Sequence, residues 1–244
     1  MTEFALNSIT RVRFGNGIAN RMSLEVYQET FCRMVALPAF RERIVQQPSE
    51  ALDGLELTPR ERKRLLAIAA QPGMRVNTAI HRANRLTPLD QTVPFTCLLL
   101  REQLPPLLER YWLENPTENL QLPAECERFA GFLKREIQTA AVVNAYLEEV
   151  LEFERVCTEL RFFTQQELRN RDSCNDGLPD LVRIVKFQHD PVRLLEALTN
   201  GQQPPADLPA GEFHLLIDYR TGEPDFRLLD AEGLAAIRRL AAEH

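Results

Sequence analysis

The sequence has little glycine and histidine, and it lacks the common motifs of catalytic sites. Its 244 residues include 10 glycines and 4 histidines. No Walker A loop, dinucleotide-binding glycine motif or nucleophile elbow occurs, so nucleotide-binding, dehydrogenase and hydrolase interpretations have no anchor. His81, His189, His214 and His244 are isolated, without the spacing of metal ligands, and His189 is expected to be a solvated turn residue. These absences argue against catalytic and metal-binding roles.

Paired cysteines are also missing. The 5 cysteines never form a C-x-x-C pair; they are Cys32, Cys97, Cys126, Cys157 and Cys174. An odd, scattered set argues against a disulfide framework and against a zinc site. Cys97 and Cys157 fall in apolar helical patterns, which favour buried structural thiols. We therefore expect no cofactor and no metal in this chain.

Long apolar runs and excess positive charge are absent as well. No window approaches the roughly 18 apolar residues of a membrane span, and the first residues have no apolar signal region. The formal net charge is -6, the wrong sign for a broad nucleic-acid-binding face. The sequence thus predicts a cytoplasmic protein that binds neither membrane nor, over a broad surface, nucleic acid.

Helix-favouring residues dominate what is present. Residues 1–22 lack helical periodicity and are expected to form an N-terminal arm, and 23–172 a helical domain. Ser23 is the expected N-cap of the first helix, and Pro38 and the Thr58-Pro59 pair mark further starts. The expected helices are 24–36, 37–47, 60–71, 74–85, 88–102, 105–114, 124–137 and 139–163, with Pro94 kinking or restarting the fifth.

The longest expected helix, 139–163, carries one apolar stripe at steps of three and four. Its members are Val143, Tyr146, Leu147, Val150, Phe153, Cys157 and Leu160. Such a stripe is typical of the central packing helix of a bundle.

The pattern changes after a polar stretch that ends in turn residues, where we place a domain boundary near residue 172. Residues 173–244 then predict the order β-α-β-β-α. The expected strands are 181–187, 213–219 and 225–229, and the helices 190–200 and 231–242. The fold class is therefore mostly α with a small α+β C-terminal domain. So small a sheet has at least one open edge. The sequence does not determine which strand forms that edge.

Residues alone favour an interaction protein, because extended peptides dock on open strand edges by adding a strand. The alternatives are a DNA-binding transcriptional regulator that uses the basic 58–75 segment, an enzyme in its own right, and an adaptor of unknown ligand. The basic residues are Arg60, Arg62, Lys63, Arg64 and Arg75. A solvated helix face is the simpler interpretation of this run.

The chain also resembles a known family. The block "YQETFCRMVALPAFRERIVQQPSEAL", the run "DPVRLLEAL", a Pro-rich loop, and the strands "HLLIDYR" and "FRLLD" resemble partner subunits of multinuclear non-heme iron-dependent oxidases. These partners act in the biosynthesis of ribosomally made, modified peptides. The TglI-like form from 3-thiaglutamate biosynthesis is favoured over the MbnC-like form that accompanies the methanobactin oxidase.

The resemblance implies a non-catalytic subunit that forms a heterodimer with the iron oxidase. Its C-terminal domain is expected to be winged-helix-like, as in precursor-peptide recognition elements, and to bind the leader as an added β-strand. The peptide's cysteine-containing core would then reach the iron in the partner chain. Helix 231–242 is expected to form the other wall of the groove. The expected peptide-binding residues are Val182, Ile184, Lys186, His214, Leu216, Asp218, Arg220, Phe226, Arg227 and Leu229.

One substitution follows from this expectation. If the hairpin supplies the edge, proline at Leu216 or Arg227 should weaken peptide binding more than folding, because it removes an outward-facing donor.

Overall fold

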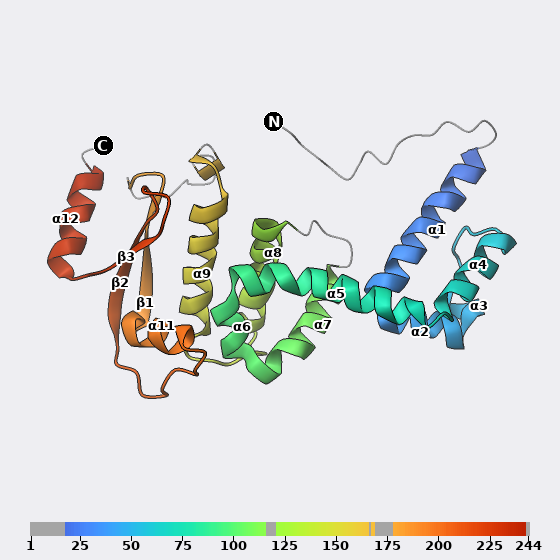
Figure 1. Ribbon diagram of the computed structural model, residues 1–244, viewed down its shortest axis with the longest axis horizontal. Helices are drawn as coiled ribbons and strands as arrows, with labels where there is room; N and C mark the ends of the chain where they lie inside the picture. The colour runs from blue at the N-terminus through green and yellow to red at the C-terminus, as the bar shows by residue number, and fades with distance from the viewer. Residues whose placement is uncertain (1–17, 116–120, 166, 169–177, 243–244) are drawn as a thin grey trace. The chain divides into compact units, whose positions relative to one another are not determined.

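The computed structural model describes residues 18–115, 121–165, 167–168 and 178–242 (Figure 1). Over this part the protein is mostly helical, with a small three-stranded antiparallel sheet near the C-terminus, as the sequence predicts. The chain divides into two compact units, Met1–His81 and Arg82–His244, and the division falls within helix α5 (Gly73–Thr92). Each unit has its own hydrophobic core.

The N-terminal unit packs short helices around one core. Before α5 come α1 (Ile18–Ala36), α2 (Pro38–Gln46), α3 (Pro48–Ala51) and α4 (Pro59–Ala69). The predicted starts at Pro38 and Pro59 are confirmed, because proline has no N–H to lose in the first helical turn. The fully buried core side chains include Met34, Ile44 and Leu65.

Two predictions near the start of the chain need correction. Ser23 does not cap a helix; it lies inside α1, and its hydroxyl donates to the carboxylate of Glu61 on α4. Thr58, by contrast, caps α4 as expected, in a reciprocal capping box with Glu61. The hydrogen bonds from Ser23 and Thr58 lower the pKa of Glu61. Of the expected arm, residues 18–22 belong to α1, and 1–17 lie outside the described residues.

The C-terminal unit continues with more helices and the sheet. Its elements are α6 (Pro94–Leu100), a 3₁₀ helix (Arg101–Gln103), α7 (Leu104–Glu114), α8 (Leu122–Gln138), α9 (Leu147–Phe162), β1 (Val182–His189), α11 (Pro191–Thr199), β2 (Ala210–Asp218), β3 (Asp225–Leu229) and α12 (Ala231–Ala242). Pro94 restarts the helix as predicted. Asp190 caps α11, accepting hydrogen bonds from two backbone amides of its first turn.

Two helix boundaries differ from the prediction. α5 continues through Pro88 instead of starting there, and the buried side chains of Leu89 and Val93 offset the lost backbone hydrogen bond. Residues 139–146 are not helical, because Ala140 has a φ of 55° and the Asn144 side chain accepts from the Tyr146 amide. α9 therefore begins at Leu147. Val143, expected in the apolar stripe, is 77% exposed.

The sheet has the order β1-β2-β3, with both neighbouring pairs antiparallel. β2 is therefore the central strand, and β1 and β3 are the two edges. In Figure 1 the sheet lies between α9 on one side and α12 on the other. α9 packs against β1, and α12 contacts β3.

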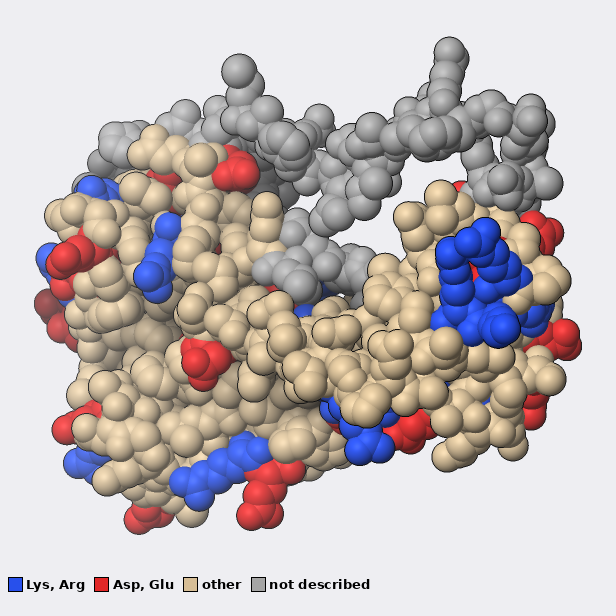
Figure 2. Space-filling view, turned by 45° about the vertical axis from the view of Figure 1, so that its right-hand side comes forward, with Lys and Arg blue, Asp and Glu red and all other residues tan. Residues whose placement is uncertain are grey.

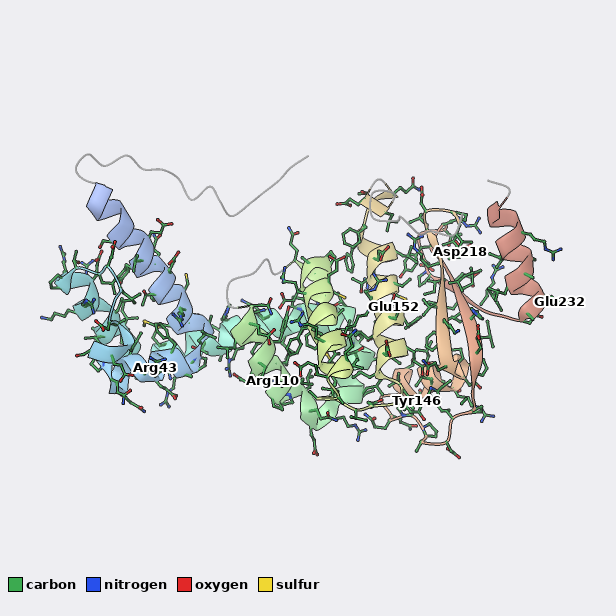
Figure 3. All side chains as sticks on the ribbon, turned by 180° about the vertical axis from the view of Figure 1, so that it is seen from behind. Arg43, Arg110, Tyr146, Glu152, Asp218 and Glu232 are labelled. Atoms are coloured by element: carbon green, nitrogen blue, oxygen red, sulfur yellow. The ribbon has the colours of Figure 1, made fainter. Side chains whose placement is uncertain are left out.

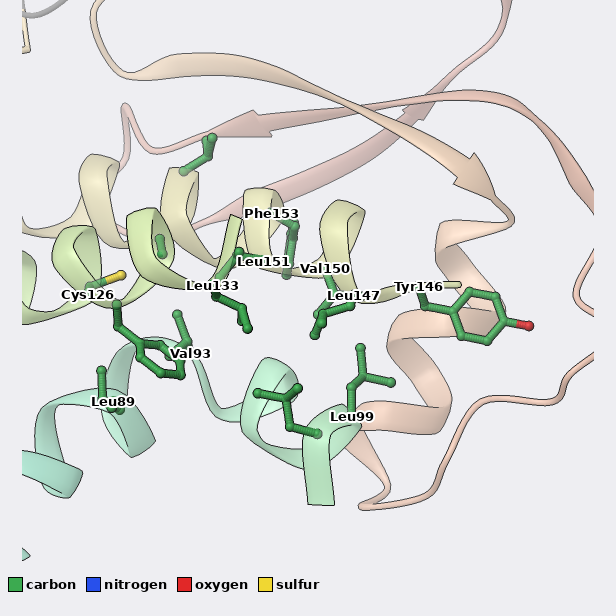
Figure 4. Close-up of a cluster of buried hydrophobic side chains, with 14 of the residues drawn as sticks. Leu89, Val93, Leu99, Cys126, Leu133, Tyr146, Leu147, Val150, Leu151 and Phe153 are labelled. Atoms are coloured by element: carbon green, nitrogen blue, oxygen red, sulfur yellow. The ribbon is translucent and has the colours of Figure 1, made fainter. Parts of the chain in front are cut away.

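The sheet and the helices of this unit share one core. Figure 4 shows side chains of α9 lying beside those of α8 and α6, with Leu147 pointing toward Leu99. The same cluster includes Phe187 of β1 and Ile217 of β2. The described residues on either side of residue 172, where the sequence places a boundary, contribute to this one core. Residues 169–177 themselves lie outside the described residues. The sheet depends on α9 to cover its apolar face.

Candidate peptide-binding edge and groove

The edge strand β3 turns two apolar side chains toward α9. Phe226 and Leu228 are opposite Ile217 and Leu215 of β2, which are buried in the core. Residues directly opposite one another share a face of the sheet, so all four lie on the core face. Phe226 and Leu228 nevertheless remain 46% and 47% exposed. They form an apolar rim along the outermost strand.

The backbone of β3 leaves two amides facing away from the sheet. Tyr219 N–H donates to the Leu181 carbonyl over 2.9 Å, which extends the β1–β2 register by one hydrogen-bonded pair. Because hydrogen bonding alternates along an antiparallel strand, Leu216 of β2 directs its N–H and C=O toward β3. Arg227, which is opposite Leu216, therefore hydrogen-bonds to β2, whereas the N–H and C=O groups of Phe226 and Leu228 point away from the sheet. No hydrogen bond from these two amides occurs among the described residues.

The other edge, β1, is partly occupied. By the same alternation its outward amides are those of Val182, Ile184, Lys186 and Gln188. Val182 N–H donates to the Pro179 carbonyl over 2.9 Å, and Gln188 N–H donates to the Glu149 carboxylate over 2.5 Å. α9, which carries Glu149, thus covers one end of this edge. The outward amides of Ile184 and Lys186 have no hydrogen bond among the described residues, so β1 also offers two donors. β3 is the more exposed edge, because four of its five residues are exposed, against two of eight in β1.

A groove of about 490 Å³ runs beside β3 on its core face. Its walls come from β2 and β3 on one side and from α9, α11, the start of α6 and the end of α5 on the other. Most lining side chains are apolar: Phe95, Phe153, Phe162, Val192, Leu195, Leu215, Tyr219, Phe226 and Leu228. Helix 231–242, which the resemblance implies as one wall of the peptide groove, contributes no described residue to the lining of this groove; α9 and α11 line it instead.

Polar groups are few in this groove. Glu154 of α9 is 4% exposed, and its carboxylate accepts from the backbone amides of Phe95 and Thr96, at 2.6 and 2.8 Å. It therefore caps α6 from another helix. Burial outweighs these amides and raises the pKa of Glu154 to about 7. Glu154 anchors α6 to α9 at the edge of the groove.

Cys157, one turn further along α9, also lines the groove. Burial, with the nearby Glu154 carboxylate adding to it, raises the pKa of the Cys157 thiol to about 12. The same cause raises the pKa of Cys97 to about 12. Both are weakly nucleophilic near neutral pH, which agrees with the expected structural role.

Arg161 is the charged residue at the rim. It is exposed, lies in the last turn of α9, and stacks over the ring of Phe162 at 5.1 Å. Among the described residues, none forms an ion pair or hydrogen bond with its guanidinium. Its charge is close enough to Tyr219 to act on the pKa of that phenol, which burial raises.

Most residues expected to bind a peptide lie on the opposite face of the sheet from this groove. By the register, this outer-face set is Val182, Ile184, Lys186, His214, Leu216, Asp218, Arg227 and Leu229. Only Phe226 of the expected set lines the groove. Arg220 follows β2 and binds Asp218. Figure 3 labels Asp218 on the sheet and Glu152 on α9.

Several outer-face side chains already have partners. Lys186 and His214 both lie near Glu212, at 3.2 and 3.5 Å, and Arg227 pairs with Asp225 on its own strand. Val182 is buried. The sequence pattern identified the alternation of faces correctly but did not reveal which face borders a groove.

The groove residues missed by sequence reasoning come from elements far apart in the chain. Leu228 follows from Phe226 by the strand period of two, but Phe153, Val192 and Leu195 lie on two helices whose approach to β3 is a tertiary feature. Val192 is 55% exposed in the structure, but nothing in the sequence around Pro191 indicates that it borders a groove.

His189 is not the solvated turn residue that the sequence suggested. It ends β1 with its side chain 18% exposed, and its Nδ1 lies 2.8 Å from the Glu149 carboxylate. Its ring also packs edge-on against Tyr146, whose hydroxyl donates to the Pro205 carbonyl. These contacts fix the start of α9 against the end of β1. Across the part of the chain described, no group of three or more His, Cys, Asp or Glu is arranged to hold a metal ion.

The basic run predicted for 58–75 lies on α4 and the start of α5. Figure 2 shows Lys and Arg side chains gathered on the N-terminal unit near α4. Arg62 is used structurally, since it donates to the carbonyls of Leu52 and Leu55 at 2.8 Å each. Arg60, Lys63 and Arg64 are exposed.

None of the described helices is sufficiently long and apolar to cross a membrane. Comparison of the sequence with known protein families and with curated proteins gave no match to either.

Proposed function

We propose that this protein binds an extended peptide by adding it as a strand to β3. The observation that carries the proposal is the pair of outward-facing amides at Phe226 and Leu228 directly beside an apolar groove. Main-chain hydrogen bonds to such an edge supply affinity, and pockets for alternate side chains supply specificity. Without a guest strand, an unpaired apolar edge would favour aggregation, whereas a bound strand would cover it.

The sequence resemblance supports a more specific role. In this proposal the guest is the leader of a ribosomally made precursor peptide, and the C-terminal unit contains a winged-helix-like recognition element. The chain itself is non-catalytic and presents the cysteine-containing core to an associated iron-dependent oxidase, in a pathway of the 3-thiaglutamate type. The iron and the reacting groups belong to the oxidase. The β-α-β-β-α order of residues 182–242 supports this part of the proposal.

A binding measurement tests the peptide part. The cognate precursor peptide that this proposal requires, labelled with fluorescein, should bind the purified full chain with a Kd in the low-micromolar range or tighter. A leader-only peptide should retain most of the affinity, and a core-only peptide or a scrambled leader should lose it. Absence of binding both with and without the oxidase would refute the proposal.

A second measurement tests the partner role. The chain and the oxidase should co-elute as a heterodimer in size-exclusion chromatography, and peptide modification should require both. Full activity of the oxidase alone would show that this chain is not a required subunit, whereas turnover by this chain alone would make it an enzyme.

The alternative of a transcriptional regulator gains no specific support. Arg62 is engaged with backbone carbonyls, and Glu61 lies within the same basic run. Because phosphate neutralisation supplies most non-specific DNA affinity, a salt-dependent mobility shift on promoter DNA would be the observation in favour of this role.

A further inference from the structure

The groove beside β3 has a chemical polarity along its length. Phe226 is opposite Ile217, which is opposite Arg183 of β1. Arg183 lies 3.5 Å from Glu159 of α9, two residues before Arg161, which lines the groove. The Phe226 end therefore lies nearer Arg161. Leu228 is opposite Leu215, nearer the strand's other end, and Val192 and Leu195 of α11 complete the lining. One end of the groove is thus cationic at its rim, while its body is apolar.

Among the described residues, Arg161 has no ion-pair partner that balances its charge. A cation in the last turn of a helix is favoured by the helix dipole, and Arg161 also stacks on Phe162. Neither contact uses its donors in an ion pair, and no described residue provides a carboxylate. The carboxylate that lines the groove, that of Glu154, accepts from the backbone amides of α6 and is not directed at Arg161. An anion arriving with a guest strand would be the complementary group.

From these observations we infer that the guest segment is an extended peptide with two apolar side chains at positions i and i+2 and an acidic side chain two positions beyond that pair, at i−2 or i+4, that pairs with Arg161. This inference rests on the proposed strand addition and specifies its substrate class. The two apolar side chains enter the groove beside Phe226 and Leu228, because alternate residues of an added strand face the same side. Arg161 fixes which end of the segment lies at the Phe226 end of the groove.

Selection from a library identifies the preferred guest directly. Random twelve-residue peptides displayed on phage are selected against the immobilised full chain, and the enriched sequences are aligned. The expected result is enrichment of large apolar residues two positions apart, with Asp or Glu two positions before or after that pair. Enrichment of sequences without this pattern overturns the inference and leaves strand addition standing. Failure to enrich any sequence counts against the proposed function as well.

A charge swap then tests Arg161. The tightest selected peptide, made with fluorescein and in a form with its acidic residue replaced by Lys, is titrated against the wild type and Arg161→Glu. Since exposed pairs contribute little and like charges repel, each single change should weaken binding by on the order of 5-fold, and the two together should restore it. Arg193→Glu, an exposed arginine on α11 outside this groove, should leave the preference unchanged. Equal binding by Arg161→Glu and wild type overturns the inference.

The location of the peptide is tested with a matched pair of valines. Val192 lines the groove and is 55% exposed, whereas Val143 is 77% exposed and lies outside the groove. Val192→Asp should reduce affinity for the selected peptide by about 10-fold or more, because it places a carboxylate in an apolar contact. Val143→Asp should have no effect. Unchanged binding by Val192→Asp would show that the peptide docks elsewhere and overturn the inference.

Discussion

The ring of Phe226, on the outermost strand, lies 5.7 Å from the ring of Phe153 on α9, measured between centroids. Phe153 is 6% exposed and also contacts Phe187 of β1, whereas Phe226 is 46% exposed. One aromatic pair thus joins the core to the open side of the groove. The two rings differ in what they stabilise.

Truncating each ring should separate folding from binding. Phe153→Ala removes a buried ring and should lower the free energy of unfolding by about 3–5 kcal/mol. Phe226→Ala should cost roughly 1 kcal/mol or less in folding, yet weaken peptide binding clearly, because this ring would be covered by the guest. Urea unfolding followed by the fluorescence of Trp112, the single tryptophan, measures the first effect, and peptide titration the second. Wild-type affinity in Phe226→Ala would contradict the placement of the guest.

Two substitutions at Leu228 should distinguish its backbone from its side chain. Leu228→Ala keeps the outward N–H and removes the apolar contact, whereas Leu228→Pro removes both. Strand addition predicts that proline costs about 1 kcal/mol more in binding than alanine, the contribution of one hydrogen bond. Both variants should fold, since proline is tolerated at an outward-facing position of an edge strand. Equal affinities of the two variants would exclude a hydrogen bond to this amide.

Proline at Leu216 or Arg227 provides the contrasting case. The sequence suggested these positions as outward donors, but the alternation of the sheet turns them toward β3 and β2, respectively. Either proline should therefore break a ladder hydrogen bond and destabilise the unit by roughly 1–3 kcal/mol, the cost of leaving its partner unsatisfied. Loss of folding and of binding together is the expected outcome for both.

The two members of a buried ion pair elsewhere in the C-terminal unit should differ strongly in how much stability their replacement costs. Arg85 and Glu125 have side chains 2% and 0% exposed, with Nη2 and Oε1 3.1 Å apart, and Arg128 binds the other carboxylate oxygen at 2.6 Å. Glu125→Gln leaves the buried Arg85 without its counter-charge and should cost about 3–5 kcal/mol. Arg85→Met leaves Glu125 still paired with Arg128 and should cost less. The double variant should be more stable than the sum of the single effects, as measured by urea unfolding.

Features of the fold that depend on neighbouring residues in the chain were predictable from the sequence, whereas features that bring distant segments together were not. Thr58, Asp190 and Pro94 act through their nearest neighbours, so their helix starts could be identified without a structure. Pro88 was misassigned because burial of the residues after it outweighs a local penalty. The hairpin was found by its alternation, but its working face depends on how α9 and α11 approach β3, which no local pattern encodes.

Glu154 should give the C-terminal unit an unusual pH dependence. Burial raises its pKa to about 7 from an ordinary 4.5, so the folded state binds a proton more tightly than the unfolded state does. The free energy of unfolding should therefore fall as pH rises from 4.5 to 7, by up to about 3 kcal/mol, and then level off. Glu154→Gln, which cannot ionise, should lose this slope. Urea unfolding of both proteins, read from Trp112 across this range, measures the difference.

Glu152, two residues away on α9, is the matched control, because its pKa is shifted in the opposite direction. Although burial opposes the effect, hydrogen bonds from Arg155 and Lys134 lower its pKa to about 2. Its stabilising contribution is present above pH 4.5 and is lost as pH falls toward 2. Glu152→Gln should thus change the acid limb and keep the slope between pH 4.5 and 7. A slope that persists in Glu154→Gln would instead assign the pH dependence to another group.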